Sequence, residues 1–158
     1  MDAAKTDQQQ QNASNAELCR ALVEYMADAL IFADRDGLIR LWNAGAEAVF
    51  GYTADEVIGK NLDIIIPERL RRAHWDGYDK ALAAGHTMHG RRALPTRSMR
   101  KDGSKLYVEL SFSVVKDADG TVIGAMAIGR DITARFEEEK AQRARIGALE
   151  AAAQAKQQ

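Results

Sequence analysis

Alternation of apolar and polar residues is the clearest pattern in the chain, and it runs from Leu106 to Val114. Every second residue there is apolar, and the residues between them are Tyr107, Glu109, Ser111 and Ser113. A strand with one buried face produces this period of two. Turn sequences, Lys-Asp-Gly-Ser at 101–104 and Asp-Ala-Asp-Gly at 117–120, stand on both sides of it. The pattern therefore predicts a three-stranded meander, with the other strands at 90–99 and 121–130.

The first half of the chain alternates short apolar runs with helix signals. Runs at 29–33 and 38–42 flank the sequence Asp-Arg-Asp-Gly, which is typical of a hairpin turn. Asn43 is a suitable N-cap for a short helix that Gly51 ends. Pro67 suits the first turn of a longer helix, predicted over 68–84 and ended by Gly85.

The two ends of the chain differ from this middle part. Residues 1–15 are rich in Gln, Asn and Ala without a hydrophobic period, and we expect them to form a disordered polar tail. An amphipathic helix should follow, because apolar residues then recur at four-residue steps, at Leu18, Leu22, Met26 and Leu30. From Thr133 onward a charged helix is predicted, so that 134–158 forms a C-terminal linker helix and tail.

Together these elements predict one α+β domain over residues 16–133. Two strands at the start and three at the end form a five-stranded antiparallel sheet, flanked by N- and C-terminal helices. A lone sheet cannot bury both of its faces, so the short helices between the strands must cover one face. An open cup between those helices and the sheet can hold a small molecule.

Composition narrows the classes of partner. The 22 Lys and Arg residues nearly balance the 23 Asp and Glu residues, so no general attraction to nucleic acid or anionic lipid is expected. No apolar run approaches the ~20 residues that span a bilayer, so membrane insertion is not expected. The single cysteine, Cys19, cannot form an internal disulfide, which suits a reducing cytoplasm.

A series of short motifs resembles a PAS domain, and the likeness covers about 25–136. The motifs are DG at 36–37, LWN at 41–43, GY at 51–52, EVIGK at 56–60, IPE at 66–68, RKDGS at 100–104 and GRDIT at 129–133. The resemblance implies the PAS fold and a sensory, dimerising module in signal transduction. Its partner would be a kinase, a cyclase or a transcription regulator. We expect a homodimer formed mainly through the N-terminal helix, with Leu18, Leu22 and Met26 in the contact.

A second, narrower resemblance concerns segment 66–85. It is similar to the helix that carries the iron-ligating histidine in haem-binding, oxygen-sensing PAS domains, where a His stands seven residues after a Pro. His74 stands seven residues after Pro67. The predicted helix face of His74 also carries Ala73, Gly77, Tyr78 and Ala81, whose small members leave room for a flat macrocycle. The resemblance implies haem b bound through His74, sensing a diatomic gas or a redox state.

Haem sensors of this family place an Arg or a Met on the strand after that helix. Arg92 stands 18 residues after His74, with Arg91 just before it, and either would hydrogen-bond a bound diatomic. Both arginines are equally compatible with a solvated surface. The other expected cofactor-binding side chains are Tyr78, Leu110 and Ile128. Alternative sixth ligands are His86, Met88 and His89.

Two functions are consistent with the sequence. A lone histidine on an apolar helix face is more often a core residue than a ligand. The alternative to the haem sensor is therefore a non-haem PAS module for protein interaction, dimerisation or binding of a small organic ligand. A flavin adduct is not expected, because Leu62 stands where that branch of the family has Cys. No Walker loop, G-x-S-x-G or H-E-x-x-H motif occurs, so we expect the chain to act by binding and not as an enzyme.

Overall fold

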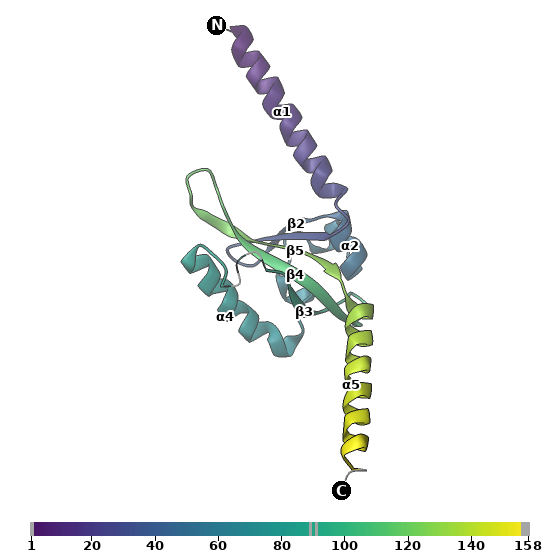
Figure 1. Ribbon diagram of the computed structural model, residues 1–158. Coiled ribbons are helices and arrows are strands. Elements are labelled where there is room, and N and C mark those ends of the chain that lie inside the picture. Colours follow the sequence, from purple (N-terminus) through teal and green to yellow (C-terminus); the bar gives the residue numbers. More distant parts are fainter. Residues whose placement is uncertain (1, 89, 91, 156–158) are drawn as a thin grey trace.

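The computed structural model describes residues 2–88, 90 and 92–155, which form a sheet with helices beside it and one long helix at each end (Figure 1). In chain order the elements are α1 (Asp2–Glu24), β1 (Ala29–Asp34), β2 (Ile39–Trp42), α2 (Ala44–Phe50), α3 (Ala54–Val57), η1 (Leu62–Ile64), α4 (Glu68–Ala84), β3 (Leu94–Met99), β4 (Lys105–Lys116), β5 (Val122–Asp131) and α5 (Thr133–Ala155). The strands form one sheet in the order β2-β1-β5-β4-β3, with every pair antiparallel. The predicted α+β fold is confirmed.

The register divides the side chains of the sheet between two faces. Leu110 pairs with Gly129 and Phe112 pairs with Ala127, so these residues share one face, which we call the inner face. The inner face packs against α2, α3 and η1, where the largest fully buried side chains include Phe50, Ile39, Leu106, Val57 and Val108. The core of the domain therefore lies at the end of the sheet that α2 and α3 cover.

The N-terminal segment corrects one prediction. Residues 2–15 were expected to be disordered, but α1 extends back to Asp2. Ala and Gln have good helix propensity, and the side chains of Gln8 and Gln11 donate to Asn12 and Asn15 one turn later, each at 3.4 Å. Residues 7–15 are all exposed, so the helix extends here without the hydrophobic period that packing against a core would require. Figure 1 shows α1 and α5 leaving the domain at opposite ends.

The first strand of the meander is also shorter than predicted, because β3 begins at Leu94 and not at Gly90. Residues 85–93 contain two glycines with positive φ, Gly85 and Gly90, which interrupt extended backbone.

Across the described residues, no helix combines the length and the apolar character that crossing a bilayer requires.

Asn43 joins α1, β1 and α2 from a buried position. Its side-chain oxygen accepts from the backbone N–H groups of Leu30 at 2.8 Å and of Ala46 at 2.9 Å. Its side-chain nitrogen donates to the carbonyls of Val23 at 3.0 Å and Asp28 at 3.1 Å. The side chain is only 1% exposed, so water does not compete for these bonds. Asn43 is thus the N-cap of α2, and its hydrogen bonds also hold the end of α1 against the sheet.

We therefore predict that Asn43→Ala lowers the free energy of unfolding by about 3 kcal/mol, because it leaves buried backbone groups without partners. Urea denaturation followed by circular dichroism measures this change. Asn61→Ala is the matched control, because Asn61 caps η1 by accepting from Asp63 N at 2.8 Å in a less buried position. The control should cost about 1 kcal/mol. If the two variants lose the same unfolding free energy, Asn43 does nothing more than cap a helix.

Candidate functional site

Helix α4 lies beside the inner face of the sheet and has the bounds predicted from Pro67 and Gly85. Its half-buried side carries Leu70, Arg71, His74, Trp75, Tyr78, Ala81 and Leu82. None of the residues of α4, all of which the structure describes, is fully buried. A helix that covers a sheet closely would bury part of its apolar stripe completely, so α4 does not seal against the strands.

The strands next to α4 show the same incomplete burial. Phe112 and Val114 of β4 and Ala125 and Ala127 of β5 share the inner face, and all four are only half-buried. The inner face is therefore closed over the core at the α2 end and only half-buried beneath α4, and we call this second part its open end.

His74 is the titratable group at this open end. Its ring is largely buried, and Nδ1 is shielded from solvent without a hydrogen-bond partner. Burial lowers the pKa of His74, and the nearby Asp63 carboxylate opposes that effect only in part. The imidazole is therefore neutral at pH 7 and keeps a free lone pair, as a ligand for a metal ion must.

Two aromatic rings enclose His74 along the helix. Trp75 meets it edge-on with ring centroids 4.8 Å apart, and Tyr78 stacks on it at 5.9 Å. The Tyr78 hydroxyl donates towards the carbonyls of Asp34 at 2.6 Å and Ala33 at 3.0 Å. Burial raises the pKa of Tyr78 to about 12, so the hydroxyl stays protonated and remains a donor. Tyr78 therefore connects α4 to the end of β1. It lies on the same half-buried side of α4 as His74, as the sequence predicted.

The predicted face of α4 was rotated relative to the real one. Ala73 and Gly77 were expected to face the sheet, but both are exposed, and an added Cβ at Gly77 would meet nothing within 4 Å. Trp75 lies on the covered side and was missed. The spacing of Arg71, Trp75, Tyr78 and Leu82, which follows the helical period, could have indicated it.

The other predicted site residues that the structure describes lie in several different parts of the domain. Leu110 is buried on the inner face, but Ile128 pairs with Ser111 and therefore points to the opposite, outer face; including it in the site was wrong. Arg92 is exposed in the connection between α4 and β3, and the alternative ligands His86 and Met88 are exposed as well. Arg91 and His89 lie outside the described residues.

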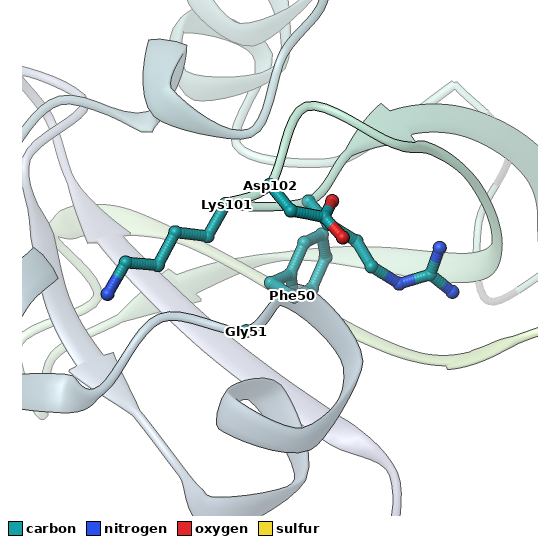
Figure 2. A pocket seen from close by; sticks show the side chains of 5 residues that line it. Phe50, Gly51, Lys101 and Asp102 are labelled. Carbon is teal, nitrogen blue, oxygen red and sulfur yellow. The ribbon is translucent and has the colours of Figure 1, made fainter.

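Other candidate sites are weaker. Within the described part of the chain, no group of three or more His, Cys, Asp or Glu side chains could hold a metal ion. A surface pocket of about 440 Å³ is lined by Phe50, Gly51, Arg100, Lys101 and Asp102, and Figure 2 shows Lys101 and Asp102 pointing in opposite directions from the turn. Its two cations are already paired, Lys101 with Glu56 and Arg100 with Asp131. This pocket therefore offers no unpaired cation to an anionic ligand.

Comparison with known proteins identifies relatives of the chain. A family model described as the PAS fold matches residues 17–132. The oxygen sensor protein DosP of Escherichia coli is 30% identical over 139 residues, which cover 88% of this chain and 17% of that protein. Among the curated relatives it matches, the chain thus spans less than a fifth of the length, 16% in an uncharacterised protein of Azorhizobium caulinodans.

Solved structures give the same fold. The PAS domain of a Colwellia psychrerythraea protein superposes with a TM-score of 0.65 at 24% identity, covering 75% of this chain and 97% of that one. An RNA-binding light-oxygen-voltage receptor superposes with a TM-score of 0.64 at 26% identity, covering 87% of this chain and 38% of that one.

The burial of His74 predicts how stability depends on pH. A histidine whose pKa is lower in the folded state binds its proton more readily in the unfolded state, so stability falls as pH drops below about 6.5. The loss continues until the pH reaches the lowered value in the folded protein. His74→Phe should flatten the plot of unfolding free energy against pH in that window, measured by urea denaturation. An unchanged slope in the variant would show that the ring takes up its proton as freely in the folded protein as in the unfolded one.

Proposed function

The chain belongs to the PAS family of sensory modules, and from that premise we propose that it binds haem b through His74 and senses a diatomic gas or a redox state. The observation that carries the proposal is the open end of the inner face, where α4 and the sheet leave their facing side chains half-buried around a neutral histidine. The likeness to a protein named as an oxygen sensor supports the same role.

The residues at this end fit the group. His74 would bind the iron from the α4 side through a lone pair of its ring, which burial keeps neutral at pH 7. Phe112 and Ala127 of the inner face would contact the macrocycle from the sheet side. Leu110 lies on the same face of β4, next to Phe112. When bound, haem supplies an iron that takes up a diatomic ligand or an electron. The protein supplies orientation and an apolar surrounding, with Tyr78 holding the helix to β1.

A non-haem module is the second candidate. The light-oxygen-voltage receptor among the similar structures shows that this fold is also found in a protein named for a different signal. The half-buried inner face of this chain would accept a flat organic molecule by the same apolar contacts, without needing the lone pair of His74. Loss of the ligand on replacing His74 therefore separates the two candidates.

The start of α5 is built to transmit a change in the sheet. Thr133 accepts from Tyr107 N through its hydroxyl at 3.0 Å, and the ring of Phe136 stacks on that of Tyr107 at 3.9 Å. Arg100 pairs with Asp131 just before the helix. Partial burial alone would raise the pKa of Asp131, but hydrogen bonds from Thr133 and the charge of Arg100 hold it below its ordinary value. Movement of β4 or β5 would thus alter the exit of α5 toward a kinase, cyclase or transcription regulator.

We expect His74→Ala to abolish stoichiometric haem binding and leave the fold intact, because His74 is not part of the buried core. Absorption spectra of protein incubated with hemin and then passed through a desalting column measure the bound fraction from the Soret band. His86→Ala is the matched control, because His86 is exposed just after α4, and it should keep the band. Arg92→Ala should also keep the band.

Two results would contradict this assignment. Full occupancy with an unchanged spectrum in His74→Ala would exclude His74 as the ligand. Absence of a Soret shift in the wild-type protein would remove the haem function and leave the non-haem module.

We also expect a homodimer held mainly by α1. The side chains of Leu18 and Leu22 are 57% and 61% exposed on one side of this helix, with the half-buried Met26 beyond its end. Because exposed leucines in a row favour burial against a partner, Leu18→Glu with Leu22→Glu should shift the protein to a monomer in light scattering. Ala13→Glu with Ala16→Glu changes the opposite side of α1 and should leave the dimer intact. A dimer that survives the leucine changes would place the interface elsewhere.

A further inference from the structure

Trp75 joins α4 to two segments that are distant in sequence. Its indole N–H donates to the Asp63 carboxylate in η1 at 2.9 Å. Its six-membered ring covers Gly37 in the turn between β1 and β2, so closely that a Cβ added there would lie 2.2 Å from Cη2. Gly37 also has a φ of 75°, which favours glycine. Only glycine at this turn leaves space for the indole ring.

The two segments that hold Trp75 are themselves connected. Leu62 N donates to the Gly37 carbonyl at 3.1 Å, and Ile39 N donates to the Lys60 carbonyl at 2.8 Å. Asp63 is further held by Arg71 of α4, whose Nε lies 3.8 Å from its carboxylate. The turn and η1 therefore form one unit, and Trp75 rests against it by a hydrogen bond on one side and by ring contact on the other.

His74 is the next residue, so any rotation of α4 about its axis moves both rings together. Successive residues of a helix are about 100° apart around the axis, and the half-buried stripe of α4 does not fix the rotation by deep packing. We propose that Trp75, held by Asp63 and by the turn at Gly37, is the positioning residue that keeps α4 at the rotation that directs His74 to the inner face. That His74 binds haem rests on the proposed function, whereas the position of the His74 ring does not.

Four single variants test the inference in the full chain. Trp75→Phe and Asp63→Ala each remove the indole hydrogen bond. Asp63→Asn removes the charge but keeps an oxygen that accepts from the indole. Trp42→Phe is the matched control, because Trp42 is a buried tryptophan whose N–H donates to the Tyr52 carbonyl at 3.1 Å, away from α4.

The first readout is the rate at which haem-loaded protein releases haem to excess apomyoglobin. Trp75→Phe and Asp63→Ala should release it about tenfold faster, as is usual when a group that orients a metal ligand is lost. Asp63→Asn and Trp42→Phe should stay near the wild-type rate. Release from Trp75→Phe no faster than from Trp42→Phe would overturn the inference. Release from Asp63→Asn as fast as from Asp63→Ala would also overturn it, because the charge of Asp63 and not its hydrogen bond to Trp75 would then matter.

The second readout needs no haem. Proton NMR of the His74 ring at a pH where the ring is neutral reports its contact with Trp75 through the ring-current shift. Asp63→Ala should move these signals and Asp63→Asn should not, with His74→Ala used to assign them. If the wild-type protein binds no haem, the proposed function fails, and these spectra alone decide the positioning role. Unmoved signals in Asp63→Ala would overturn it.

Discussion

The attachment of α4 to the turn between β1 and β2 is the interaction on which the rest of this site depends. Trp75 lies over Gly37, and the Tyr78 hydroxyl donates to the backbone at the end of β1. These contacts hold the helix by polar groups and ring edges, where most covering helices are held by a buried apolar stripe. They hold α4 beside the sheet although none of its residues is fully buried.

A few polar contacts also connect the sheet to the helices at both ends of the chain. Asn43 fixes the end of α1 to β1 and α2, and the Arg100–Asp131 pair fixes the start of α5 to the turn before β4. The strands between these points, β1 and β5, pair directly with each other and present Ala33, Ala125 and Ala127 to the inner face. A ligand that presses on these strands therefore acts on the elements that carry the flanking helices.

Most of the fold was predictable from local signals, because each of those signals has one physical meaning. Alternation in β4, the caps at Asn43 and Gly51, and the Pro67–Gly85 limits of α4 all depend on residues within one turn or strand. The errors came from contacts between distant residues. On α4, Trp75 meets Asp63 and the turn at Gly37, which are distant in sequence, so the helical spacing indicates its face but not these partners. The face of Ile128 depends on the register of β5 against β4, and the predicted strand limits carried no such information.

The candidate site was predictable only in part for the same reason. His74 and Tyr78 combine polar aromatic rings with the helical spacing, so the sequence indicated both as candidates. Trp75 acts by position. Leu110 lies on the inner face, and its place in the uninterrupted alternation of β4 indicates that face, whereas its role in a site stays a prediction. The direction of Arg92 was not predictable, because the described residues of 85–93 form no helix or strand whose period would give it.

Hydrogen exchange tests most directly the claim that α4 is a loosely attached cover whose packing a ligand completes. In the free protein, the amides of α4 should exchange much faster than those of β4 and β5, because no α4 side chain is fully buried. Adding hemin should slow exchange along α4 and leave α2, which is packed on the core, unchanged. Protection of α4 equal to that of the central strands before hemin is added, or unaltered by it, would contradict the account.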